Sequence, residues 1–283
     1  STISYRWEVI TGSIIQLGAV ILYRKTYTLT ELNERQSIDT SLLSIRIFKG
    51  DFRNLEAVYY YILMVIVSSI FILIARALYP PENAYSIMRD TISFLGSSDP
   101  DNNPPGWIFL SIAFVILSLT FFPLTIFHFK KFKELDKVGA AILLLFYFIA
   151  TIGMFLLAFF PDNGGESFLQ DVSAGRIHNL VALLAIGGFA LGLLLQFFLF
   201  AKDHMPIFKG KKLYPVKSFI YPMILFLILV VMIAYTQLYW DITCESGCWP
   251  GEGIYSFPLW EWIAFITMII LEGWILLIIS KKE

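Results

Sequence analysis

Five residues of this chain combine side-chain types and positions that could do chemistry: Asp90, Ser93, Asp162, His178 and Glu261. Each lies in, or beside, a polar segment between long apolar stretches. The two aspartates could bind an amine or a cation, Ser93 and His178 could hydrogen-bond a polar head group, and Glu261 could orient them. In an enzyme, His178 would be the general base, with Asp162 or Asp90 as the group that orients it. We predict a ligand site from these five residues.

His178 has a competing interpretation as a structural histidine held by hydrogen bonds. The other two histidines, His128 and His204, fall in gaps that we assign below to the opposite face of the membrane. Zinc hydrolases usually assemble several histidines, so we expect no metal here and no cofactor. The run Asp99, Asp101 and Asn103 begins like a calcium loop, but Pro104 and Leu110 occupy the positions that require glycine and glutamate.

A carboxylate also lies inside an apolar stretch, at Glu272. Ionisable groups at membrane depth are costly and frequently functional, so Glu272 is a candidate for proton or cation handling. Gly188 and Gly192, four residues apart, predict a close approach of two helices within this molecule.

These residues must be positioned by membrane-spanning helices. Hydrophobic residues make up 57% of the chain and charged residues 15%, against roughly 25% charged in a soluble domain. A helix needs about 20 apolar residues to cross the hydrocarbon core. We therefore predict an all-α, polytopic transmembrane helical bundle with six certain spans, at residues 55–79, 107–127, 138–160, 178–200, 218–240 and 259–280.

The N-terminal segment, residues 1–54, is predicted separately from the six-helix bundle of residues 55–283. Its apolar stretch, Val9 to Tyr23, is short and contains Gln16, so it either forms a seventh span followed by a cytoplasmic loop or belongs to a small cytoplasmic appendage. Residues 44–48 alternate polar and apolar side chains, which is typical of a strand. A small strand-bearing domain is therefore an alternative for this segment.

Basic residues fix the expected orientation. The gaps 24–54, 128–137 and 201–217 hold six, four and five Lys or Arg residues, whereas 81–106, 161–177 and 241–258 hold one, one and none. Cytoplasmic loops carry the Lys and Arg excess, so we place the first set inside, the second set outside and the C terminus inside, in the cytoplasmic membrane. The inner basic residues suit anionic lipid head groups, and nothing indicates nucleic-acid binding.

Cys244 and Cys248 both fall in the last outer gap. The outer compartment is oxidising, and Gly247 would permit the tight turn of a five-residue ring, so we predict a disulfide between them.

Short motifs in the three outer segments resemble the six-span family that includes the DRAM and FRAG proteins and the GPI-anchor lipid-remodelling factor. The matching pieces are residues 89–96 (RDTISFLG), Phe160-Pro161-Asp162 followed by His178, and the segment from Cys244 to Trp262. The resemblance covers residues 55–280 and implies six spans, distinctive outer loops and a role in lipid handling or membrane trafficking. It provides no catalytic residues, and the N-terminal 54 residues depart from it.

The leading prediction is a non-enzymatic or weakly enzymatic membrane protein that binds or handles a lipid or small amphiphile at its outer face. Two alternatives stay open: an accessory or structural subunit of a larger membrane complex, and a lipid-remodelling enzyme. The expected partners are membrane lipids, with a protein partner in the second case.

Overall fold

Six long helices dominate the computed structural model, which describes residues 40–53, 55–82, 85–99, 102–162, 167–169, 172–205, 213–243 and 255–280. The chain divides into two units, Ser1–Ser44 and Ile45–Glu283. Only residues 40–44 of the first unit are described, so the account below concerns the second. The predicted seventh span at Val9–Tyr23 and the fold of the N-terminal segment lie outside the described residues and stay predictions.

Each of the six helices is long and apolar enough to cross a membrane. This finding confirms the predicted all-α fold with six spans, and the chain is a multi-pass membrane protein. In chain order the helices are α3 (Glu56–Ala77), α5 (Trp107–Phe132), α6 (Lys137–Leu157), α7 (Ala174–His204), α8 (Val216–Thr243) and α9 (Phe257–Ser280). The shorter elements are α2 (Thr40–Phe48), α4 (Ile92–Leu95) and the antiparallel pair β1 (Ser167–Leu169) and β2 (Val172–Ser173).

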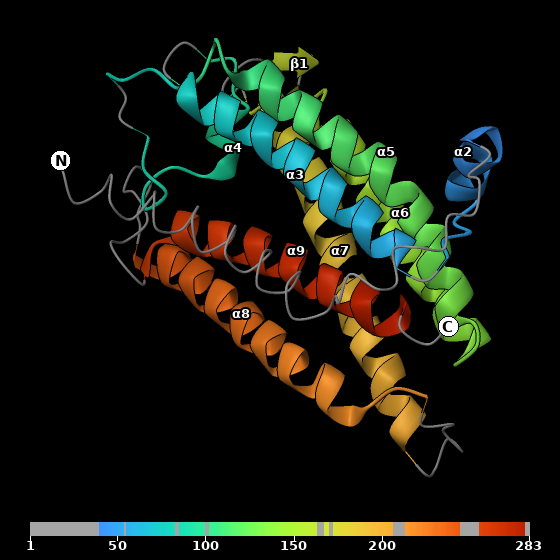
Figure 1. Ribbon diagram of the computed structural model, residues 1–283. Coiled ribbons are helices and arrows are strands. Elements are labelled where there is room, and N and C mark those ends of the chain that lie inside the picture. The colour runs from blue at the N-terminus through green and yellow to red at the C-terminus, as the bar shows by residue number, and fades with distance from the viewer. Residues whose placement is uncertain are drawn as a thin grey trace. The chain divides into compact units, whose positions relative to one another are not determined.

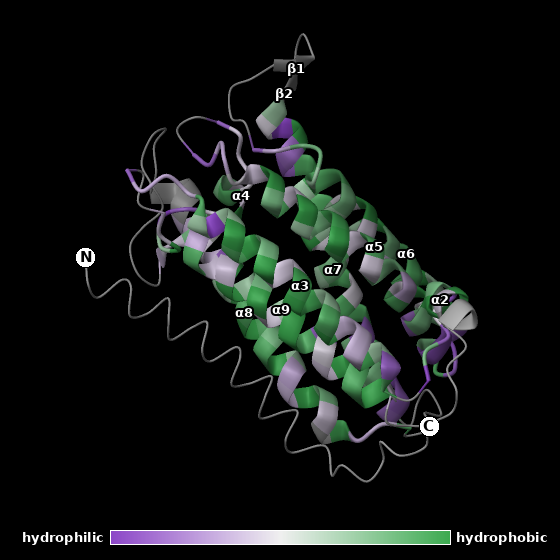
Figure 2. Cartoon of the chain, turned by 45° about the horizontal axis from the view of Figure 1, so that its top comes forward, coloured by the Kyte–Doolittle hydropathy of each residue, from purple (hydrophilic) through white to green (hydrophobic). Residues whose placement is uncertain are grey.

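The helices pack so that α3, the first long helix in the sequence, contacts α9, the last. α3 packs against α5 and α9, α6 packs against α5 and α7, and α8 packs against α9 and α7. Figure 1 shows α8 and α9 side by side, with α5 and α6 across the bundle. The helices are apolar along most of their length, and polar residues gather at their ends and in the loops (Figure 2). This distribution is what a bundle surrounded by lipid requires.

The strand interpretation of residues 44–48 is wrong, because they belong to helix α2. A lone strand would leave its backbone groups unpaired, whereas a helix satisfies them internally. The end of α2 is fixed by Arg46, whose guanidinium donates to both carboxylate oxygens of Glu56 at 2.6 and 2.9 Å. This pairing with Glu56 raises the pKa of Arg46.

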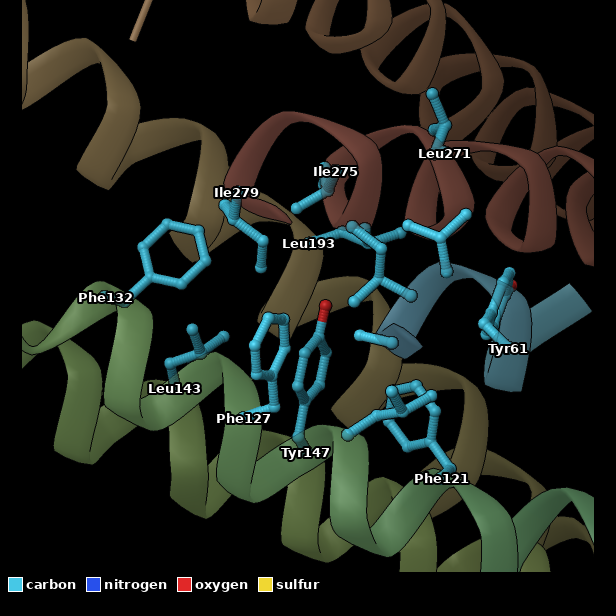
Figure 3. Close-up of a cluster of buried hydrophobic side chains, with 14 of the residues drawn as sticks. Tyr61, Phe121, Phe127, Phe132, Leu143, Tyr147, Leu193, Leu271, Ile275 and Ile279 are labelled. Carbon is cyan, nitrogen blue, oxygen red and sulfur yellow. The ribbon is translucent and has the colours of Figure 1, made fainter. Parts of the chain in front are cut away.

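The contact between α6 and α7 depends on small residues. A methyl group at Gly188 would lie 2.8 Å from the backbone nitrogen of Ala150, and one at Gly192 would lie 2.1 Å from the ring of Tyr147. The predicted close approach at these two glycines is therefore confirmed as a contact within the molecule. It brings the ring of Tyr147 into the bundle core, where it meets Phe121 and Leu193 (Figure 3).

The corner between α5 and α6 is held by Asp136. Its Oδ1 accepts the backbone N–H of Gly139 at 2.7 Å, which caps α6. Its Oδ2 pairs with the ammonium of Lys202 near the end of α7. One carboxylate therefore ties the start of α6 to the end of α7.

Candidate functional site

The segment between α3 and α5 is folded back on the bundle and carries Ser93 on the short helix α4. The amide of Asn103, which is fully buried, donates to the carbonyls of Ala75 at 3.0 Å and Leu95 at 2.9 Å. These bonds fasten α4 to the end of α3. In the sequence, Asn103 belongs to a run that resembles the start of a calcium loop. In the structure its side chain instead holds two helices together by hydrogen bonds.

His178 joins this loop to the corner between α6 and α7. Its ring is 6% exposed. Nδ1 lies 2.8 Å from the carbonyl oxygen of Phe160, and Nε2 lies 3.1 Å from Oγ of Ser93. Because a carbonyl can only accept, Nδ1 is the donor to Phe160. A neutral ring in this tautomer would present Nε2 as the acceptor for the Ser93 hydroxyl.

Glu261 connects the start of α9 to the same short helix. Its Oε2 accepts the backbone N–H of Ile92 at 3.0 Å. Two further bonds strengthen this junction: the indole N–H of Trp262 donates to the hydroxyl of Tyr85 at 2.9 Å, and the hydroxyl of Ser256 donates to the carbonyl of Met88 at 2.6 Å. Ser93, His178 and Glu261 therefore meet at one place, from three separate parts of the sequence.

These three residues line one end of a cavity of about 220 Å³ in the centre of the bundle. Most of its other walls are apolar side chains from α3, α5, α6, α7 and α9, among them Met64, Phe114, Leu117, Phe121, Phe189 and Phe265. The cavity is thus an apolar chamber with a polar end, where a hydroxyl, an imidazole and a carboxyl side chain converge. An apolar space with a few placed polar groups is the usual form of a small-molecule site.

Asp90 and Asp162 do not line the cavity. Oδ2 of Asp90 accepts the backbone N–H of Ser86 at 2.6 Å, and partial burial raises the pKa of Asp90 despite that bond. Asp162 follows Pro161, which does line the cavity, and it lies near enough to Glu261 to interact with it electrostatically. The structure thus brings three of the five predicted site residues together and leaves these two beside the polar end.

A second polar cluster lies deeper in the bundle, where His128, Tyr147 and Glu272 meet from α5, α6 and α9. All three side chains are fully buried. Nε2 of His128 lies 2.9 Å from Oε1 of Glu272, and the hydroxyl of Tyr147 donates to Oε2 of Glu272 at 2.8 Å. Nδ1 of His128 lies 2.7 Å from the carbonyl oxygen of Leu124. In Figure 3 the hydroxyl of Tyr147 points toward α9.

His128 was predicted to lie in the gap that follows the span 107–127, but the structure places it inside a helix. Helix α5 extends to Phe132, five residues past its predicted end at 127, and His128 is buried inside it. The nearby lysines obscured this, because Lys130 and Lys131 in the next half-turn suggest a loop. The available signal was Glu272, whose burial in an apolar stretch demands a polar partner from another helix.

Two predictions about this part of the protein stay open. Cys244 and Cys248, and with them the predicted disulfide, lie outside the described residues. Among the residues that the structure describes, no group of three or more His, Cys, Asp or Glu side chains could hold a metal ion.

Comparison with known proteins places the chain in a family but supplies no activity. No curated protein and no solved structure matches it. One family model, described as "Protein of unknown function (DUF998)", matches residues 62–277, more than half of the 283-residue chain. This match gives no support to the resemblance to the DRAM and FRAG proteins. The matched region contains all five predicted site residues and the buried cluster, and the chain belongs to the DUF998 family.

Proposed function

We propose that the protein binds one apolar chain of a lipid or small amphiphile in the central cavity, with the polar head at Ser93, His178 and Glu261. The observation that carries this proposal is the cavity itself, which is apolar along its walls and polar at one end. Its volume is below the roughly 300 Å³ at which typical small-molecule pockets begin. A single hydrocarbon chain suits this space better than a whole phospholipid.

The polar end can recognise a head group in two ways. The Ser93 hydroxyl and the His178 ring can exchange their mutual bond for bonds to a ligand hydroxyl or carbonyl. Glu261, with Asp90 and Asp162 nearby, makes this end acidic and suits an amine or another cationic group. The resemblance of the outer motifs to lipid-handling membrane proteins remains an expectation that agrees with this ligand class.

Photo-crosslinking with a diazirine-bearing fatty alcohol and a diazirine-bearing fatty amine would test the proposal in nanodiscs. Cross-links should map to cavity residues such as Phe114 and Phe189. The variant Ala182→Phe places a ring in the cavity and should abolish them. Its neighbour Leu183 is 68% exposed, so Leu183→Phe is the matched control and should keep them. Equal labelling of both variants, or labelling only of lipid-facing residues, would exclude the cavity as a ligand site.

A second candidate function, acyl-ester hydrolysis or transfer, is favoured by the Ser93–His178 pair. A neutral imidazole with Nδ1 held by a carbonyl and Nε2 facing a serine hydroxyl is the arrangement that activates a serine nucleophile. A fluorophosphonate probe tests this directly. Labelling of Ser93 that is lost in His178→Ala, with Ser111 in the same cavity unlabelled, would support the enzyme. No labelling of Ser93 would leave the binding function alone.

Native mass spectrometry of the gently extracted protein separates these proposals from the third alternative. A bound lipid supports the cavity function. A stable protein partner without lipid would instead favour an accessory subunit of a membrane complex.

A further inference from the structure

We propose that His128, Glu272 and Tyr147 form a proton-binding site inside the membrane, and that this site exchanges its proton through the central cavity. The proposal is independent of whether the cavity binds a lipid. It follows from the hydrogen-bond partners of the three side chains and from their surroundings.

The hydrogen-bond partners of His128 and Glu272 require a proton between Nε2 of His128 and Oε1 of Glu272. The carbonyl of Leu124 can only accept, so Nδ1 of His128 is a donor. Nε2 then faces Oε1 of Glu272 at 2.9 Å. Two lone pairs at this distance would repel each other, so a proton resides on one of the two atoms. It makes either an imidazolium beside a carboxylate or a neutral imidazole beside a carboxylic acid, and both forms have no net charge.

Losing this proton would leave a net negative charge in the membrane interior, which is strongly unfavourable. Among the described residues, the other titratable groups around the pair are Tyr147 from α6, which donates to Oε2, and Tyr61 from α3, which interacts electrostatically with Glu272. Neither supplies a positive charge to replace the proton. The buried cluster therefore binds a proton as its ligand.

Stability alone gives little reason for such a cluster. Buried ion pairs contribute no more than well-packed apolar side chains of similar volume, because desolvation offsets their attraction. The surrounding core, with Leu271, Ile275 and Leu143, shows that apolar residues fill this layer elsewhere. Three polar groups from three helices are thus better explained by proton binding than by packing.

The cavity lies next to this cluster and offers a space from which a proton can arrive. The ring of Tyr147 makes an edge-to-face contact with Phe121 at a centroid distance of 5.2 Å and stacks on Phe189 at 5.6 Å. Both phenylalanines line the cavity. The His128 ring also makes an edge-to-face contact with Phe127 and stacks on Phe132. One aromatic layer therefore separates the proton from the cavity.

The bound proton is directly observable, because the chain has three histidines. In a His178→Gln, His204→Gln background, ¹⁵N NMR of labelled histidine reports His128 alone. At about pH 8, where a free histidine is neutral, we expect either an imidazolium signal or, in the infrared spectrum, a protonated carboxyl band. Glu272→Gln should remove whichever is seen, and the control Glu82→Gln, at an exposed carboxylate in the loop after α3, should leave the His128 signals unchanged. A neutral His128 together with an ionised Glu272 in the background protein would overturn the proposal, even if Glu272→Gln fails to fold.

The route is tested by the exchange of this proton for deuterium in nanodiscs. Filling the cavity with Ala182→Phe should slow the exchange by about tenfold or more, equivalent to about 1.4 kcal/mol of added barrier. Leu183→Phe should leave the rate unchanged. Equal rates in the two variants would show that the proton does not pass through the cavity.

Discussion

At the scale of single residues, several charged groups among the described residues connect one helix to another. Asp136 shows this outside the membrane core, where its two carboxylate oxygens reach Gly139 and Lys202. These contacts, led by the Gly139 N–H, hold the pKa of Asp136 below its usual range. Its charge is therefore favoured by folding.

Asp136→Ala should lower the free energy of unfolding by about 1 kcal/mol at neutral pH, the usual contribution of a helix N-cap. Because the pKa is lower in the folded state, the stabilisation is complete above about pH 4 and is lost as the pH falls through the folded-state value. Unfolding curves of the wild type and the variant in detergent should therefore converge as the pH falls through and below the folded-state pKa of Asp136. The exposed carboxylate Glu82, replaced by Ala, should show no such difference, and an effect of Asp136→Ala that does not change with pH would contradict the explanation.

At the scale of elements, the contact between α6 and α7 sets the position of Tyr147. Gly192 leaves room for its ring, while Gly187, on the same helix, faces open space: a methyl group there would meet only a side-chain carbon of Leu183, at 3.9 Å. The two glycines therefore give a matched pair of substitutions.

Gly192→Ala should destabilise the protein by about 1–3 kcal/mol, because the new methyl group overlaps the ring of Tyr147. Gly187→Ala should stabilise it by about 0.5–1 kcal/mol, since alanine loses less entropy than glycine in a helix. Thermal unfolding of both variants in the same detergent measures the difference. Stabilisation by Gly192→Ala, like that expected of Gly187→Ala, would show that the close contact at Gly192 is absent.

The sequence was sufficient to predict the six helices. A long apolar segment bounded by charged residues satisfies its backbone hydrogen bonds in a membrane by forming a helix. The sequence also placed Ser93, His178 and Glu261 at or near helix ends on one face, and the structure brings them to one cavity, while their role in binding a ligand stays a prediction. It was insufficient for the cavity, whose walls are ordinary apolar side chains. The sequence was also insufficient to predict the burial of His128. Whether a residue near a lysine-rich helix end points into the bundle depends on how the helices pack, and the neighbouring residues in the sequence do not reveal this.

At the scale of the whole molecule, the alternation of basic and acidic gaps predicts an orientation that the helix packing alone does not determine. Lys133 and Glu82 are exposed residues at opposite ends of the described helices: Lys133 follows α5, and Glu82 lies in the loop after α3. They provide one test position for each face.

Single cysteines at these positions should react from opposite sides, in a background in which Cys244 and Cys248 are replaced by serine. Glu82→Cys should be labelled by an impermeant maleimide in intact cells, and Lys133→Cys only in inverted vesicles, because basic loops stay in the cytoplasm. Detergent-solubilised protein, in which both should react, is the control. The reverse pattern would invert the orientation and place the polar end of the cavity in the cytoplasm.

The depth of Glu272 has a consequence for its response to membrane voltage. It lies fifteen residues after Phe257, the start of α9, or about 22 Å along the helix axis. A proton that reaches it from the outer face crosses much of the roughly 30 Å hydrocarbon core. Moving one elementary charge through the whole transmembrane field changes its free energy by about 2.3 kcal/mol per 100 mV. In the predicted orientation, a potential that is negative inside would therefore draw the proton into the proposed site, and depolarisation would favour its release.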